Sequence, residues 1–194
     1  MRLKIVQAGE PVLRQPAKPV NKTELAGSEI QSLIEAMRAT MHDAPGVGLA
    51  APQVGLSLQI AVIEDKPDYT RDVKPAVLRE RERKPVPFHV IVNPQITLLG
   101  NPDVEFFEGC LSLTGFTAVV PRTRAVRVDC LDHRGTPKTI EASGWYARIL
   151  QHEIDHLQGT VYIDRMYPRS FMSLDNFNRY WKEKPEAETR ELIG

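Results

Sequence analysis

The run that most constrains this 194-residue chain is Gln151-His152-Glu153-Ile154-Asp155-His156, set among apolar residues with helical spacing. We expect a helix over about residues 144–158, with Ser143 as its N-cap and Gly159 as its stop. Apolar side chains occur all round this helix, namely Ile149, Leu150, Ile154 and Leu157. The helix is therefore predicted to be central and buried, and its imidazoles and carboxylates need partners there.

The histidines of this run have the spacing of a metal-binding helix. His152 and His156 lie about 40° apart on one helical face, so both imidazoles can bind one divalent ion. Glu153 would face the open side of that ion and could take a proton from bound water. The alternative is an exposed polar helix face with chance spacing, and the apolar flanks argue against it.

Asp155 points about 60° away from His152, on the side opposite Glu153. A buried carboxylate in that place needs a cation. We expect it to pair with an arginine from the strands, with Arg122 as the candidate.

A catalytic metal ion usually has three protein ligands, and a third must come from elsewhere. No histidine follows His156, and Glu183 and Glu186 lie in a polar tail interrupted by proline. Cys110, in the segment Glu108–Ser112, is the better candidate because a thiolate suits Zn²⁺ or Fe²⁺. Taken alone, Cys110 could equally be a small buried hydrophobe. The other cysteine, Cys130, is predicted to be a core residue of an alternating strand.

The segment Gly46–Gly55 is rich in glycine and alanine, which let a backbone approach a ligand closely. Gln53 is the one amide side chain in it and could donate an N–H where an oxyanion develops. A tight turn between helix and strand explains the glycines but not the glutamine.

The remaining pattern predicts an α+β fold of short antiparallel strands around the central helix, with an N-terminal and a C-terminal helix. We expect a helix over 28–42, capped by Ser28 with Gln31, and a helical tail over 170–185 that frays beyond. The expected strands are 58–64, 89–92, 95–99, 125–131, 138–141 and 161–163. All of this fits a single domain, 1–194, whose residues from about 170 form the C-terminal helix or tail.

A polar stretch, 65–87, interrupts this pattern. Its first interpretation is a solvated loop or a short exposed helix. The sharper one is a lid over a site, because long loops in compact domains are often functional.

Composition narrows the function. With 25 basic and 25 acidic residues the net charge is zero, which argues against a dedicated binder of nucleic acid or of membrane surfaces. Hydrophobic residues make up 42% and charged residues 26%, as in ordinary soluble domains, and no apolar run approaches the ~18 residues of a membrane span.

Three segments together resemble the peptide deformylase family, with its G-x-G-x-A-A-x-Q, E-G-C-x-S and H-E-x-x-H motifs. They are GVGLAAPQ (46–53), EGCLS (108–112) and HEIDH (152–156), in the family's order, and the likeness runs from about Leu3 to Tyr167. The segments 115–122 and 143–149 look like those of the subgroup found in plant and animal mitochondria and some bacteria.

The resemblance implies a metal-dependent hydrolase that removes the N-terminal formyl group from formylmethionine of new polypeptides and releases formate. The implied metal ligands are Cys110, His152 and His156. Glu153 would be the general base and then the acid, and the Gln53 side chain and Leu111 N–H would form the oxyanion hole. Val47, Gly48 and Gly109 would pair with the substrate backbone, and Trp145 and Ile149 would line the methionine pocket.

The cofactor implied by the resemblance is one divalent ion, with Fe²⁺ favoured in the cell, although Zn²⁺, Ni²⁺ and Co²⁺ also suit the ligands. Expected partners are formylmethionyl peptides of nascent chains, with no DNA and no membrane. Some family members dock on the ribosome through a basic C-terminal helix. Here the tail's basic and acidic residues balance, which leaves at most a transient contact. We expect bacterial cytoplasm, or a mitochondrial or plastid matrix if a transit peptide was removed.

Two other functions remain open at this point. An H-E-x-x-H metallopeptidase would need a downstream ligand and would leave the EGCLS segment unexplained. A structural metal site in a binding module would need four protein ligands, whereas three are found.

Overall fold

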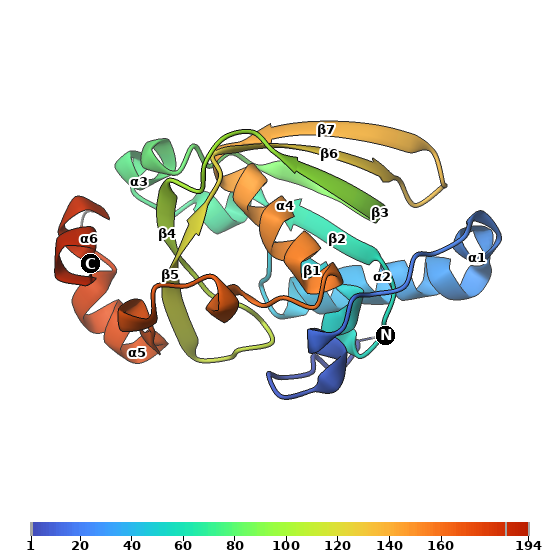
Figure 1. Ribbon diagram of the computed structural model, residues 1–194, viewed down its shortest axis with the longest axis horizontal. Helices are drawn as coiled ribbons and strands as arrows, with labels where there is room; N and C mark the ends of the chain where they lie inside the picture. The colour runs from blue at the N-terminus through green and yellow to red at the C-terminus, as the bar shows by residue number, and fades with distance from the viewer. Residues whose placement is uncertain (1, 185, 194) are drawn as a thin grey trace.

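The computed structural model describes residues 2–184 and 186–193, which form two antiparallel sheets with a helix between them (Figure 1). The larger sheet has the order β1 (Gly48–Ala50), β2 (Ile60–Asp65), β3 (Val86–Leu98), β6 (Ala125–Leu131), β7 (Pro137–Ser143). The smaller has the order β4 (Val104–Glu108), β5 (Phe116–Arg122), β8 (Met172–Ser173). The α+β prediction is confirmed.

The helix between the sheets is α4 (Gly144–Leu157), the one predicted to be central. It contacts every strand of the larger sheet, and its apolar residues join the core built on that sheet's inner face. Ser143 is the N-cap residue as predicted, although its side chain makes no capping hydrogen bond.

The end of α4 depends on Gly159. This residue has φ of +75°, and a Cβ placed on it would lie 2.8–2.9 Å from backbone atoms of Arg14 and Gln15. The chain thus needs glycine there both for the left-handed turn and for the close approach of the N-terminal segment.

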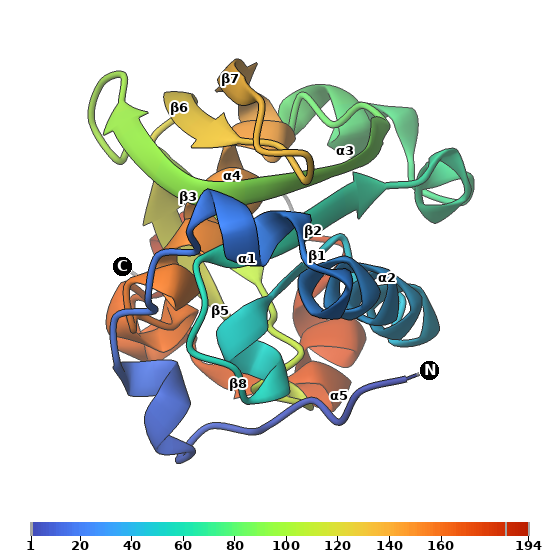
Figure 2. The ribbon, with the colours of Figure 1, turned by 90° about the vertical axis from the view of Figure 1, so that its right-hand side faces the viewer.

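The opposite face of the larger sheet is covered by α2 (Ser28–Asp43), seen end-on beside β1 and β2 in Figure 2. In β2, Ala61 and Ile63 pack toward α4, whereas Ile60 and Val62 pack toward α2. Both faces of β2 are buried, which explains why its sequence over residues 60–63 is a continuous run of apolar residues.

Three short helical elements precede or follow α2: a 3₁₀ helix Pro11–Arg14, α1 (Lys22–Ala26) and a 3₁₀ helix Ala51–Val54. The capping box predicted for Ser28 with Gln31 is wrong, because α2 starts after Gly27 without a side-chain cap. The Gln31 amide instead donates to the carbonyl oxygens of Leu25 and His133. The capping box belongs to α1.

Two strand predictions need correction. The expected strands 89–92 and 95–99 are parts of β3, which continues through a shift of register at Asn93, where φ is +50°. The expected strand 161–163 is wrong: Tyr162–Asp164 is a 3₁₀ helix in which the Asp164 carboxylate accepts from the Val161 N–H. The strands β4 and β5 were not anticipated.

The stretch 65–87 contains a 3₁₀ turn, Pro67–Thr70, and a short helix, α3 (Pro75–Glu80). The expected short exposed helix is therefore present within it.

The C-terminal residues are less regular than predicted. A 3₁₀ turn, Pro168–Ser170, leads to β8, then α5 (Leu174–Asn176), a π-helical turn, Phe177–Trp181, and α6 (Glu186–Ile193). The prediction of one continuous helix is wrong because Met172 and Ser173 pair with the edge of β5. The expected fraying is also wrong, since α6 follows Pro185, which itself lies outside the described residues. Across 2–184 and 186–193, no helix is long and apolar enough to cross a membrane.

Replacement of Gly159 by alanine tests the junction between α4 and the N-terminal segment. We expect Gly159→Ala to lower the free energy of unfolding by at least ~2 kcal/mol, because overpacking adds to the cost of the left-handed conformation. Gly135→Ala is the matched control, since Gly135 has φ of +79° but its nearest contact would be an ordinary 3.7 Å. Urea denaturation measures both, and equal losses would show that contact with Arg14 and Gln15 is unimportant.

Candidate metal centre

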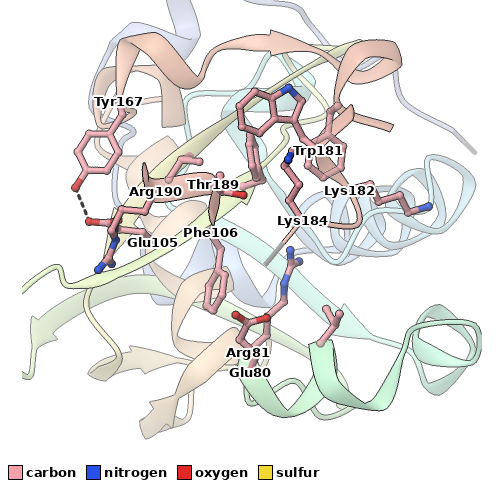
Figure 3. A pocket seen from close by; sticks show the side chains of 14 residues that line it. Glu80, Arg81, Glu105, Phe106, Tyr167, Trp181, Lys182, Lys184, Thr189 and Arg190 are labelled. Carbon is pink, nitrogen blue, oxygen red and sulfur yellow. Dashed lines mark hydrogen bonds and ion pairs between the residues drawn. The ribbon is translucent and has the colours of Figure 1, made fainter. Parts of the chain in front are cut away.

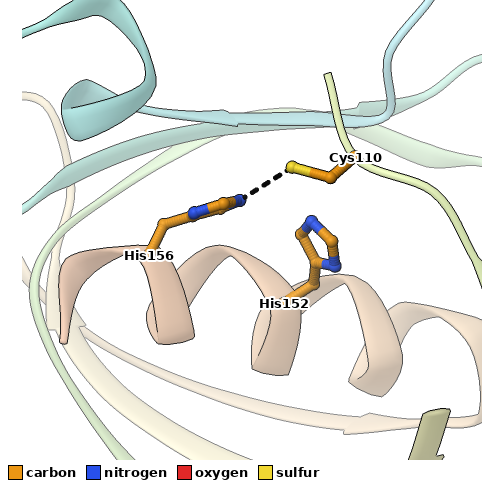
Figure 4. Close-up of side chains that lie close together, drawn as sticks. All are labelled: Cys110, His152 and His156. Carbon is orange, nitrogen blue, oxygen red and sulfur yellow. Dashed lines mark hydrogen bonds between the residues drawn. The ribbon is translucent and has the colours of Figure 1, made fainter. Parts of the chain in front are cut away.

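The side chains of Cys110, His152 and His156 lie close together, with both imidazoles on one helix and the cysteine opposite them (Figure 4). Cys110 follows β4, and both histidines project from α4; the candidate ligand atoms all lie within 4.8 Å of one another. The Cys110 Sγ and the His156 Nε2 are 3.3 Å apart. Ligands on a tetrahedral ion at ~2.0–2.3 Å are separated by ~3.3–3.8 Å, so this donor set fits one divalent ion.

Glu108 fixes the orientation of His152. One carboxylate oxygen accepts from the His152 Nδ1 at 2.9 Å, which leaves the Nε2 of that ring to face the cluster. Arg122 donates to both Glu108 oxygens at 3.0 Å, and Arg148 adds a bond of 2.6 Å. Burial opposes ionisation, but Arg122 and His152 together hold the pKa of Glu108 well below its usual range. Glu108 is thus a buried carboxylate.

Glu108 is the first residue of the EGCLS motif, but no role for it was predicted from the sequence. Its signal was available: a charged residue one position before a glycine and two before the candidate cysteine ligand. A histidine ligand normally donates its second N–H to such a carboxylate.

The predicted pairing of Asp155 with Arg122 is confirmed, at 2.5 Å. Arg165 donates two further bonds of 2.7 Å to the same carboxylate. The ionic and hydrogen-bonded contacts therefore form one connected network, which runs through Asp155, Arg122, Glu108 and His152. This network joins α4 to β4 and β5.

Glu153 is 4% exposed and packs directly on Gly48. A Cβ at position 48 would lie 2.2 Å from the Glu153 Oε1, so only glycine leaves room for the carboxylate. The second oxygen, Oε2, has no hydrogen-bond partner among residues 2–184 and 186–193. Burial raises the pKa of Glu153 to about 7, against the opposing effect of His152.

Gln53 is held so that its amide N–H groups face the cluster. Its Oε1 accepts from the Ala50 N–H at 2.8 Å, and its Nε2 lies 3.5 Å from the Cys110 Sγ and 3.4 Å from the Ser112 Oγ. The N–H of Leu111 donates to no group in the described part of the chain. Two donors without strong acceptors thus lie beside the candidate ligands.

A cleft of about 500 Å³ opens onto this arrangement. This cleft is lined by every residue that was given a site role from the sequence except His156, which is 1% exposed. Those lining residues are Val47, Gly48, Gln53, Gly109, Cys110, Leu111, Trp145, Ile149, His152 and Glu153.

Other residues in the wall of the cleft had no role predicted from the sequence. Leu174 and Phe177 come from the C-terminal residues, and Arg81 and Arg83 follow α3. The Arg81 and Arg83 guanidinium groups lie 4.9 and 5.4 Å from the Trp145 ring centroid. Arg83 also makes two bonds of 2.8 Å to the buried Asp65. The end of the 65–87 stretch therefore packs against Trp145 and forms part of the wall of the cleft.

A second cavity, of about 90 Å³, lies between α3, β4 and the C-terminal helices (Figure 3). Neither cysteine nor histidine is among its lining residues. Phe107, Phe177 and Arg81 line both cavities and so separate them. The larger cleft is therefore the candidate active site.

Comparison with known proteins gives a match to the polypeptide deformylase family over residues 2–171. The chain is 47% identical to the chloroplastic peptide deformylase 1A of Solanum lycopersicum, covering 90% of this chain and 63% of that protein. It is 45% identical to peptide deformylase 3 of Streptomyces avermitilis, covering 99% and 84%. Its fold matches a Met-Ala-Ser-bound peptide deformylase from Acinetobacter baumannii, with TM-score 0.75, 32% identity, and coverage of 85% and 99%.

Metal affinity tests the role of Glu108. We expect Glu108→Gln to weaken binding of Zn²⁺ or Ni²⁺ about 10- to 100-fold. A neutral amide is a weaker acceptor for the His152 Nδ1–H than an ionised carboxylate, so it holds the ring less firmly. Competition with a chromophoric chelator measures the affinity, and circular dichroism confirms that the variant is folded. Glu105→Gln, on the same strand, is the control; unchanged affinity in a folded Glu108→Gln protein would contradict the assignment.

Proposed function

The chain belongs to the polypeptide deformylase family, and from that membership we propose that its cleft removes the formyl group from N-terminal formylmethionine and releases formate. The observation that carries this proposal is the meeting of a Cys-His-His donor set, an unpartnered glutamate and an amide donor in one cleft. Each group has the chemistry that hydrolysis of a formamide requires.

The family implies a metal ion, and we assign Cys110, His152 and His156 as the residues that would hold it. Such an ion supplies a water of lowered pKa and polarises a carbonyl oxygen. We propose Fe²⁺ as the ion in the cell, with Zn²⁺, Ni²⁺ and Co²⁺ accepted by the same ligands.

Glu153 is assigned as the general base and then the general acid. Its carboxylate would accept a proton from the attacking water and deliver it to the amine nitrogen as the C–N bond breaks. Burial raises the pKa of this carboxyl, which suits a group that must both accept and release a proton. Contact with Gly48 supports this role, because it keeps the carboxylate in one position.

Gln53 and Leu111 are assigned as the donors to the developing oxyanion. The Ala50 N–H occupies the Gln53 Oε1, so the Nε2 is the group available to the substrate. Removing one such donor typically costs about 10²–10³ in turnover.

The backbone of Val47, Gly48 and Gly109 would pair with the extended substrate. Trp145 and Ile149 would line the pocket for the methionine side chain. Support comes from their shared position in the wall of the cleft, and from the peptide Met-Ala-Ser bound to the similar Acinetobacter protein.

The partners we propose are formylmethionyl peptides at the ends of nascent chains. The balanced charges of the tail support no more than a transient ribosome contact. The relatives include a chloroplastic and a bacterial protein, so we propose bacterial cytoplasm, with an organellar matrix as the second compartment. We propose one catalytic domain, 1–194, with a tail from about 170 that the family match leaves almost entirely outside.

Formate release tests the proposed activity. Protein loaded with Fe²⁺ under argon, or with Ni²⁺, should release formate from formyl-Met-Ala-Ser and leave acetyl-Met-Ala-Ser intact. A chelator should abolish the release, and added Ni²⁺ should restore it. Cleavage of an internal peptide bond in unformylated peptides, or metal binding without formate release, would contradict the proposal.

Substitution of Glu153 separates metal binding from catalysis. We expect Glu153→Ala to retain one metal ion per chain and to lose at least about 10²-fold in turnover, because no other group in the cleft is assigned to take the water's proton. Metal analysis and formate release are measured on the same sample, with the exposed Glu141→Ala as control. Full activity with metal bound would remove Glu153 from the mechanism.

A further inference from the structure

The wall of the cleft includes residues that lie beyond the family match. That match ends at residue 171, yet Leu174 and Phe177 line the same cleft as Cys110 and Glu153. A feature outside the shared domain therefore reaches the candidate active site.

This C-terminal wall is held firmly against the smaller sheet. Met172 pairs with Thr117 and Ser173 with Phe116, and the Leu174 N–H donates to the Gly115 carbonyl oxygen at 2.9 Å. The Ser173 hydroxyl then caps the next turn. Leu174 and Phe177 are thus placed by backbone hydrogen bonds, not left on a loose tail.

Aromatic contacts join this wall to the strands beside the cleft. Phe171 stacks on Phe116 with ring centroids 5.0 Å apart, and Phe177 contacts Phe107 at 4.7 Å. These four residues with Leu174 form what we call the apolar lip. Phe107, Phe116, Leu174 and Phe177 line the cleft itself.

Much of the apolar lip is exposed. Phe116 is 43% exposed, Phe171 41% and Leu174 39%. Neighbouring exposed apolar side chains of this kind typically mark a binding surface. The lip is continuous with the cleft that holds the candidate catalytic groups, so a peptide bound in that cleft is the occupant that can cover it.

We propose that the apolar lip is a specificity subsite for the side chains of the two residues that follow formylmethionine, and that it favours apolar ones. The inference rests on the proposed deformylase function and assigns a role to the C-terminal residues. Covering exposed Leu and Phe side chains removes apolar area from water on both partners.

Phe177 also shapes the wall of the cleft. With Phe107 and Arg81 it separates the cleft from the smaller cavity under the C-terminal helices. Truncating Phe177 should merge the two spaces and leave a peptide side chain without a surface to contact. Its loss should therefore raise KM for apolar peptides more than it changes kcat.

Four peptides measure the preference: formyl-Met-Ala-Ser, formyl-Met-Leu-Ser, formyl-Met-Ala-Phe and formyl-Met-Leu-Phe. We expect the wild-type kcat/KM for formyl-Met-Leu-Phe to exceed that for formyl-Met-Ala-Ser about 10-fold. In Leu174→Ala and Phe177→Ala this ratio should fall to about two-fold or less. The two intermediate peptides assign the gain to the second or the third residue.

Two controls isolate the lip. Tyr180→Ala removes an exposed aromatic side chain from the same C-terminal segment that lines neither cavity, and it should keep the wild-type ratio. Phe177→Leu keeps an apolar side chain and should restore most of the ratio lost in Phe177→Ala.

The outcomes separate this inference from the proposed function. Formate release from no peptide would mean that the proposed function itself is wrong. Release with no apolar preference, or with a preference that survives both alanine substitutions, would overturn only the apolar subsite. An equal loss on all four peptides that Phe177→Leu does not repair, or a change in oligomeric state at constant ratio, would show instead a structural or self-association role.

Discussion

The structure depends on the burial of a helix that carries charge. Helix α4 brings His152, Glu153, Asp155 and His156 into the space between two sheets, all but His152 less than 6% exposed. The surrounding strands contribute Arg122 and Glu108, and Arg148 of α4 itself also binds Glu108. Removing one partner of such a buried pair typically lowers the free energy of unfolding by about 3–5 kcal/mol, because the remaining charge is buried without a counter-charge. This network sets the positions of the two sheets relative to α4, and therefore the positions of the candidate site residues.

The same network divides the polar groups of α4 into two sets. Asp155 and the Nδ1 of His152 are satisfied by protein partners from β4, β5 and the segment after α4. The Oε2 of Glu153 is not, and the His156 Nε2 has the Cys110 sulfur as its neighbour. The unsatisfied Glu153 oxygen belongs to a residue that lines the cleft. A fold held by satisfied charges thus leaves a few polar atoms for chemistry.

Much of this arrangement was predictable from the sequence because the informative signals are local. Helical spacing placed His152, Glu153 and His156, and the same spacing put Asp155 on the side away from Glu153, where a buried carboxylate needs an arginine such as Arg122. The part that sequence missed depends on contacts between distant segments. The register of β4 against β5 positions Glu108 for its hydrogen bond with His152. Met172 and Ser173 pair with the edge of β5, so they do not form part of the predicted helix. Similarly, the 161–163 run has strand-like composition, but a local 3₁₀ turn forms there, in which the Asp164 carboxylate accepts from the Val161 N–H.

In the proposed mechanism, α4 and the Cys110 loop would together hold one metal ion and leave a position on it open to water. X-ray absorption at the metal edge of the loaded protein tests this most directly. We expect one sulfur and two imidazole nitrogens, with a remaining light ligand that exchanges with solvent, and loss of the sulfur shell in Cys110→Ser. A shell of four protein ligands, or one without sulfur in the wild-type protein, would contradict it.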